Sequence, residues 1–239
     1  MIAGTTTLVG LIGDPVAGSL SPRMQNAAFA ARGLDWAYVP LRVEHAALDT
    51  AVAGLVALGF AGANITIPHK TSVIPFCHEL DETAERSASV NTLVIRHGRV
   101  VGSSTDAEAL DEVEARSAAV VGSGGAAGAW IAALDARGVP AQVFSRRERW
   151  PPETGGVELV VHATPVKDEL LFEPRPGQTV VDLAYLPDGR DTALVAAARA
   201  AGCTVVDGLE VLARQGAASF ERWTGVAAPL EIMRAAVRS

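Results

Sequence analysis

The sequence contains little lysine and little cysteine, and both shortages are informative. Only Lys70 and Lys167 are lysines among its 20 basic residues. A lysine in this chain therefore draws notice, because lysine can lose its proton near neutral pH in a suitable site and arginine cannot. The two cysteines, Cys77 and Cys203, lack the spacing of a metal site. They indicate incidental thiols in a reducing compartment, with a structural disulfide as the alternative.

Excess positive charge and long apolar runs are also missing. The net charge is −7 at pH 7, which disfavours binding to nucleic acid or to an anionic membrane. Gly, Pro or charged residues interrupt every apolar run before it reaches the roughly 20 residues that span a bilayer. The first residues carry no basic segment typical of a signal peptide. We expect a cytoplasmic monomer or homodimer with a small-molecule partner and no nucleic-acid or membrane partner.

The first hundred or so residues alternate between strand and helix patterns. A helix is expected to open at Ser21-Pro22, with Ser21 as the N-cap and Pro22 in the first turn, and to end at Gly33. The order β-α-β-α-β predicts a mostly parallel sheet. We expect strands at 7–12, 36–43 and 62–67, a helix at 47–58, and a hairpin formed by 91–96 and 99–102 around His97-Gly98.

A second α/β unit begins near residue 118. Short apolar strands alternate there with helices, which predicts a doubly wound, Rossmann-type domain. Two α/β domains imply a cleft for a small ligand. The expected strands are 118–121, 141–144, 159–163, 179–183 and 204–206, and the expected helices are 107–116, a helix from the glycine loop to about 137, 192–201, and a helical tail over 209–238.

A glycine-rich loop follows the first strand of this second unit and opens its helix. Glycines in that context let the backbone approach a pyrophosphate, and the helix N-terminus supplies N–H donors. The loop predicts dinucleotide binding, and the alternative is a tight turn that binds nothing. The residues concerned are Gly122, Ser123, Gly124, Gly125 and Ala126.

The next strand ends in Ser145-Arg146-Arg147, and no acidic residue occurs before Glu148. An acidic side chain at this point usually binds the free ribose 2′-hydroxyl of NAD, whereas arginine accommodates the 2′-phosphate of NADP. The loop therefore favours NADP over NAD. The alternative is a solvated basic loop, which Glu148 and Arg149 keep open.

Motifs along nearly the whole chain resemble those of the shikimate dehydrogenase family. Each motif alone is modest, but this many of them in the same order are specific. They are 13–22 (GDPVAGSLSP), 64–70 (NITIPHK), 89–93 (SVNTL), Thr105-Asp106, the glycine loop, Ser145-Arg146, 163–165 (ATP), Asp182 with Tyr185, Gly208-Leu209, Gln215 and 223–225 (WTG).

The resemblance implies an NADP-dependent oxidoreductase that interconverts 3-dehydroshikimate and shikimate in aromatic amino acid biosynthesis. It implies a substrate domain of 1–106 and 210–239, to which the last helices return, and an NADP domain of 107–209. Lys70 and Asp106 would be the catalytic pair. The implied substrate-binding residues are Ser19, Ser21, Thr66, Asn91, Tyr185 and Gln215, and the implied cofactor contacts add Arg147, Thr164, Leu183 and Gly208 to the loops above.

The residue types suit this chemistry independently. Oxidation of a secondary alcohol needs a hydride acceptor and a group that takes the hydroxyl proton, and a lysine beside a carboxylate is able to exchange that proton. Simpler roles remain open: Lys70 as a surface residue, Asp106 as the N-cap of the helix over 107–116, Asn91 as a turn residue and Gln215 as an exposed helix position. His69 and His162 are expected to be neutral loop residues, and no metal site is expected.

Some positions depart from the family pattern and leave the substrate open. Gly18, Ser104 and His162 replace the family's usual His, Asn and Asn, and Glu210-Val211 replaces Gly-Met. The stretch between Asp106 and Gly122 is also short. Quinate or an aminated shikimate is therefore an alternative substrate, and a non-catalytic NADP-binding sensor is an alternative function.

Overall fold

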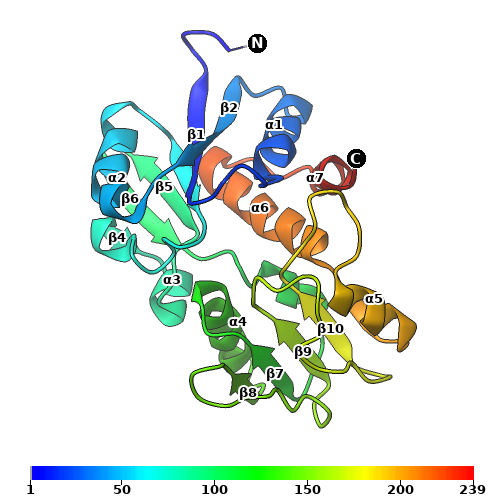
Figure 1. Ribbon diagram of the computed structural model, residues 1–239. Coiled ribbons are helices and arrows are strands. Elements are labelled where there is room, and N and C mark those ends of the chain that lie inside the picture. The colour runs from blue at the N-terminus through cyan, green and yellow to red at the C-terminus, as the bar shows by residue number, and fades with distance from the viewer. Residues whose placement is uncertain (1) are drawn as a thin grey trace. The chain divides into compact units, whose positions relative to one another are not determined.

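A computed structural model describes residues 2–239, apart from the side chain of Glu112, and its chain divides into two compact units (Figure 1). Unit 1 comprises Met1–Thr105 and Ala213–Ser239, and unit 2 comprises Asp106–Leu212. The second division falls inside one helix, α6 (Gly208–Thr224). Unit 1 is therefore built from the two ends of the chain.

Unit 1 contains a mixed six-stranded sheet in the order β2-β1-β3-β5-β6-β4. β1 is parallel to β2 and to β3, and β4 is parallel to β6. β5 pairs antiparallel with β3 and β6, which confirms the expected hairpin around His97-Gly98. The strands are β1 (Thr7–Gly13), β2 (Trp36–Arg42), β3 (Gly62–Ile65), β4 (Glu79–Leu80), β5 (Thr92–Arg96) and β6 (Arg99–Ser103).

Helices pack against this sheet through their apolar faces. α2 (Leu48–Ala57) buries Leu48, Val52 and Leu55 against strand residues. α1 (Ser21–Ala31) lies beside α7 (Leu230–Arg238), the last helix of the chain (Figure 1). The smaller elements are α3 (Glu82–Ser87) and the 3-10 turns η1 (His45–Ala47) and η2 (Ile74–Phe76).

The expected N-cap of α1 is wrong by one residue. Leu20 occupies the N-cap position, and no side chain caps this end of the helix. Ser21 is already helical and buried, with Pro in the first turn as expected. The Ser19 hydroxyl instead accepts a hydrogen bond from the Ser21 backbone N–H at 3.2 Å, so the turn before the helix is held by Ser19.

Unit 2 contains a fully parallel sheet in the order β11-β10-β9-β7-β8. Alternate residues of β7 face different cores: Ala118 and Val120 pack with α4, and Ala119 and Val121 pack with α5. Helices therefore cover both faces, which confirms the doubly wound α/β class. The elements are β7 (Ala118–Val121), α4 (Gly125–Ala136), β8 (Ala141–Phe144), β9 (Leu159–His162), β10 (Thr179–Asp182), α5 (Ala193–Ala200) and β11 (Thr204–Val206).

Two connections of unit 2 contain no α-helix. The helix expected over 107–116 is wrong: only the 3-10 turn η3 (Glu108–Glu112) forms, because Val113 becomes extended (φ −119°) as the chain approaches β7. Residues 145–158, between β8 and β9, contain no helix and no named strand. The usual six-stranded order is 3-2-1-4-5-6, so this sheet lacks the third strand and β8 is its edge.

Candidate functional site

The expected substrate-binding residues of unit 1 gather at one edge of its sheet. The parallel strands β1 and β3 end there, and β5 begins there, since Asn64 at the end of β3 pairs with Thr92 at the start of β5. Ser19 and Ser21 follow β1, Thr66 and Lys70 follow β3, and Asn91 precedes β5. The carboxyl ends of parallel strands are the usual location of ligand sites in open α/β sheets.

A buried polar network fixes Asn91 at this edge. The Asn91 amide donates to Thr105 Oγ1 at 2.9 Å and to Gln215 Oε1 at 3.3 Å, and its carbonyl oxygen accepts from the Thr105 N–H at 2.9 Å. Two predicted site residues that lie 124 positions apart are thus in direct contact.

The network extends through residues that the sequence did not single out as site residues. Thr105 Oγ1 donates to the Gln215 backbone carbonyl at 3.0 Å, and Ser219 Oγ lies 2.8 Å from Thr92 Oγ1. The Asn64 amide donates to Ser219 Oγ at 3.0 Å. Isolated Ser, Thr and Asn residues on different elements carry no shared pattern, so sequence reasoning had no signal that would join them.

Lys70 lies on a turn that is anchored on both sides. Its backbone carbonyl accepts a hydrogen bond from the Val90 N–H at 2.8 Å. The neighbouring His69 is fully buried, and its Nε2 lies 2.7 Å from the Val43 carbonyl. Because a carbonyl only accepts, His69 carries its proton on Nε2, and its hydrogen bond to Val43 fixes the position of the turn. The Lys70 side chain is half-buried.

Asp106 is the first residue of unit 2 and directly follows Thr105 of the network. The indole N–H of Trp130 donates to its backbone carbonyl at 2.9 Å. The position is therefore held by α4. The interpretation of Asp106 as the N-cap of a long helix is wrong, because η3 takes Ala107 as its N-cap and no side chain caps it.

The glycine loop of unit 2 has the features of an anion site. Gly124 is the N-cap of α4, with no side-chain cap and no acidic residue in the first turn, so no carboxylate competes there for a bound phosphate. Gly122 has φ +134°, and a Cβ at this position would lie 2.5 Å from the Ala163 carbonyl oxygen. Only glycine fits this close contact between the ends of β7 and β9.

Arginines on the turn after β8 divide into free and engaged side chains. Arg149 contacts Gln142 Oε1 at 3.2 Å and Glu153 Oε2 at 3.8 Å, and its guanidinium stacks on Phe144. Among the described residues, Arg146 and Arg147 contact no carboxylate; Arg146 lies over the Trp150 ring at 5.5 Å. Arg146 and Arg147 therefore have no carboxylate partner to give up for a phosphate, whereas Arg149 has one.

Further expected cofactor positions lie at the carboxyl ends of β9 and β10. Thr164 follows β9, and the Leu183 N–H donates to the His162 carbonyl at 2.9 Å. Gly208 packs so tightly on the loop after β10 that a Cβ would lie 2.1 Å from the Ala184 carbonyl oxygen. Tyr185 belongs to the same loop, and Lys167 Nζ lies 5.7 Å from its ring centroid. The only feature of the sequence that drew notice to Lys167 was the scarcity of lysine in this chain.

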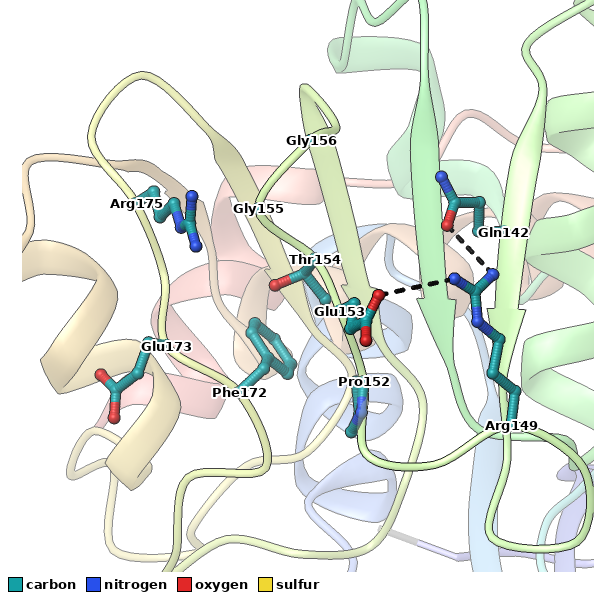
Figure 2. Close-up of a pocket in the computed structure, with 10 residues that line it drawn as sticks. All are labelled: Gln142, Arg149, Pro152, Glu153, Thr154, Gly155, Gly156, Phe172, Glu173 and Arg175. Carbon is teal, nitrogen blue, oxygen red and sulfur yellow. Dashed lines mark hydrogen bonds and ion pairs between the residues drawn. The ribbon is translucent and has the colours of Figure 1, made fainter.

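A cavity of about 660 Å³ lies elsewhere in unit 2 (Figure 2). Gln142, Gly156 and Arg175 line it close to the amino-terminal halves or starts of β8, β9 and β10, away from the carboxyl ends where dinucleotides bind. Figure 2 shows Arg149, one of its lining residues, joined to Gln142 and Glu153. None of its lining residues is a predicted site residue, so we do not assign the cofactor to it.

The described residues contain neither a disulfide nor a cluster of metal ligands. Cys77 and Cys203 are both free, and burial raises the pKa of Cys77 to about 11, which makes it a poor nucleophile. The described residues contain no group of three or more His, Cys, Asp or Glu side chains that would hold a metal. No described helix is long and apolar enough to cross a membrane.

Similarity to known proteins identifies the family. A model of the shikimate dehydrogenase substrate-binding domain matches residues 11–93, and a model of the shikimate 5′-dehydrogenase C-terminal domain matches 208–238. The NADP(+) shikimate dehydrogenase of Rubrobacter xylanophilus is 40% identical, over 99% of this chain and 97% of the relative. The chain belongs to the shikimate dehydrogenase family.

Solved members of the family have the same fold. Shikimate 5-dehydrogenase from Thermus thermophilus, crystallised with NADP(H) and shikimate, is 31% identical with a TM-score of 0.86, covering 97% of this chain and 98% of that one. Quinate dehydrogenase from Corynebacterium glutamicum in complex with NAD is 28% identical with a TM-score of 0.83, covering 97% and 98%. Solved structures similar to this chain therefore include more than one ring acid and more than one cofactor.

This family member is compact. Its 239 residues align with the Rubrobacter relative over 279 positions, so the relative has about 40 residues without counterpart here.

One departure from the family pattern has a simple structural explanation. Glu210 lies in the first turn of α6, where a negative charge interacts favourably with the helix dipole. Its backbone N–H donates to Asp207 Oδ1 at 2.9 Å. Glu210 therefore fits a helix-start position.

Proposed function

We infer that this protein is an NADP-dependent shikimate dehydrogenase, which interconverts 3-dehydroshikimate and shikimate. Relatives of this name match almost the full chain at about 40% identity, and the Thermus structure holds both NADP(H) and shikimate. The observation that carries the proposal in this chain is an uncapped α4 N-terminus beside Arg146 and Arg147, which contact no carboxylate among the described residues. We further propose that it acts in the cytoplasm as a monomer or homodimer.

The residues of unit 2 fit NADP. The N–H groups at the start of α4 suit the pyrophosphate, and Ser145, Arg146 and Arg147 suit the 2′-phosphate. The bound dinucleotide supplies the hydride acceptor or donor of the reaction. We assign the remaining cofactor contacts to Thr164, Leu183 and Gly208.

Unit 1 would bind the ring acid. Hydroxyl groups of Ser19 and Ser21 suit the substrate carboxylate, and Thr66, Asn91 and Gln215 suit ring hydroxyls. The Asn91–Gln215 contact supports this assignment, because two amides held together present donors and acceptors in fixed positions. We assign Tyr185 of unit 2 to the ring as well.

We assign the proton transfer to Lys70 with Asp106. Oxidation of the ring alcohol removes a hydride from carbon and a proton from oxygen; the neutral Lys70 amine would take that proton and return it in the reverse direction. Asp106 would stabilise the resulting ammonium. Quinate is the second candidate substrate, which the similarity to a quinate dehydrogenase favours.

The deciding experiment compares the wild type with Lys70→Arg. Shikimate oxidation is followed by NADPH absorbance, with quinate and NAD as parallel arms. Arginine keeps the charge but cannot act as a base, so we expect kcat to fall about 10²- to 10⁴-fold with NADPH binding unchanged. A variant as fast as the wild type would exclude Lys70 as the base. A wild type that binds NADPH but oxidises quinate instead of shikimate would exclude the main substrate assignment.

A further inference from the structure

His162 connects a buried carboxylate to a predicted cofactor residue. It is the last residue of β9 and is 2% exposed. Its Nδ1 lies 2.8 Å from Asp182 Oδ1, and its Nε2 lies 2.6 Å from Thr164 Oγ1. Both ring nitrogens are therefore used, and the chain Asp182–His162–Thr164 runs from the interior of unit 2 to the loop after β9.

Asp182 is fixed in place by two other donors. It is fully buried at the end of β10, directly beside His162 in the strand register. Oδ1 also accepts from the Ala184 N–H at 2.9 Å, and Oδ2 accepts from Thr192 Oγ1 at 2.5 Å. Because an ionised carboxylate only accepts, we assign the proton of the neutral His162 ring to Nδ1.

This tautomer fixes the direction of the Thr164 hydroxyl. Nε2 then carries a lone pair, so the Thr164 O–H donates to it. A hydroxyl has one hydrogen and two acceptor positions. One acceptor position receives the Val166 N–H at 3.3 Å, and the other remains. Thr164 thus offers an acceptor and no donor to anything that binds beside it.

Thr164 also lies where a dinucleotide is expected. It follows Ala163, which packs against Gly122 of the glycine loop and donates its N–H to the Val121 carbonyl at 2.8 Å. The chain leaves β7 toward β8 on one side and β9 lies on the other side. This switch in strand order is the place where open α/β sheets bind nucleotides.

We propose that His162 is a positioning residue. By accepting a hydrogen bond from the Thr164 hydroxyl, it leaves Thr164 only an acceptor position for a hydrogen-bond donor of the bound dinucleotide. The donor is either a ribose hydroxyl or the carboxamide N–H₂ of the nicotinamide. The inference rests on the proposed NADP-binding function and adds a specific role for the buried His–Asp pair.

The first test concerns the tautomer and uses the whole protein. Long-range ¹H–¹⁵N NMR of the histidine rings, with His162→Gln for assignment, should show the Nδ1–H form for His162. A neutral ring protonated on Nε2 would overturn the proposal, because the Thr164 hydroxyl would then be free to donate. This readout does not depend on catalysis or on cofactor binding.

The second test measures cofactor affinity. Thr164→Val should weaken NADPH binding about fivefold, as the loss of one neutral hydrogen bond does, and Thr164→Ser should restore it. The matched control is Thr204→Val, an exposed position on β11. His162→Leu should weaken binding in the wild type but have little additional effect in the Thr164→Val background, because His162 acts through Thr164. A merely structural role would give additive losses.

Cofactor analogues identify the donor. If the Thr164→Val loss disappears with the acetylpyridine analogue of the cofactor, the donor is the carboxamide; if it persists, the donor is a ribose hydroxyl. Thr164→Val that binds NADPH as the wild type does would overturn the proposal while leaving the function intact. A wild type that binds no NADPH would instead refute the proposed function.

Discussion

At the scale of single residues, neighbouring arginines on one loop have different roles. Arg149 is held by Glu153 and Gln142, whereas Arg146 and Arg147 contact no carboxylate among the described residues. A cation that is already engaged contributes less to a new ligand, because its existing contacts must be broken first. Arg149 is therefore a control, on the same loop, for the proposal that Arg146 and Arg147 bind the 2′-phosphate.

We predict that Arg146→Ala weakens NADPH binding by about 10- to 100-fold, the worth of a charge-assisted hydrogen bond, and changes NADH binding by less than about twofold. Arg149→Ala should affect both cofactors little. Fluorescence titration of each variant with NADPH and NADH checks this. Equal losses for the two cofactors would show that Arg146 does not recognise the 2′-phosphate.

The sequence indicated individual site residues better than their connections. Asn91 and Gln215 were expected near one another only through family resemblance, and they are in contact. His162 was interpreted as a neutral loop residue, but it ends a strand and is buried in a hydrogen-bonded chain. The available signal was that His162 and Asp182 each stand one residue before the end of a predicted strand, 159–163 or 179–183. The order of the strands in the sheet had to be known to use that signal.

At the scale of elements, capping glycines and apolar periodicity predicted the long helices and most strands. The sequence did not reveal α3 or η2, which are too short to show periodicity. It overextended 107–116, because Ala109, Leu110 and Val113 have helical spacing but are buried by a 3-10 turn and an extended residue. The helical preference of these residues is overridden there, because the chain must extend within a few residues to reach β7.

Two glycines, one inside α2 and one after its end, give a test at this scale. Gly54 lies inside the helix with open space around a would-be Cβ, and Gly59 follows the helix with φ +73°. Gly54→Ala should raise stability by about 0.5–1 kcal/mol, and Gly59→Ala should lower it by about 1–2 kcal/mol. Thermal or urea unfolding measures both changes, and a stabilised Gly59→Ala would contradict the left-handed assignment.

At the scale of the whole molecule, unit 1 depends on segments from both ends of the sequence. Phe220 of α6 stacks on Phe29 of α1 with ring centroids 5.3 Å apart, and the Trp223 indole N–H donates to the Leu93 carbonyl at 2.9 Å. Unit 2, in contrast, is one continuous segment. The mixed sheet and these long-range contacts are what composition and periodicity could not predict.

We predict that a fragment of residues 1–105 lacks a cooperative thermal transition, because it loses these contacts and the Ser219 hydroxyl that satisfies Asn64. A fragment of 106–212 should melt cooperatively. Circular dichroism and amide NMR spectra of the two fragments distinguish these outcomes. A well-dispersed spectrum for 1–105 alone would show that the last helices are dispensable for its folding.

The divided unit also sets the order of events on the ribosome. Synthesis proceeds at about 5–20 residues per second, and the six strands of unit 1 emerge well before α6 and α7. During that interval Phe29, Leu93 and Asn64 lack their later partners. Those partners are Phe220, Trp223 and Ser219, respectively. The segment translated second, residues 106–212, is thus the first able to finish folding. The first hundred residues remain partly uncovered until α6 and α7 have been made, and this is the stage at which we expect this protein to rely most on chaperones.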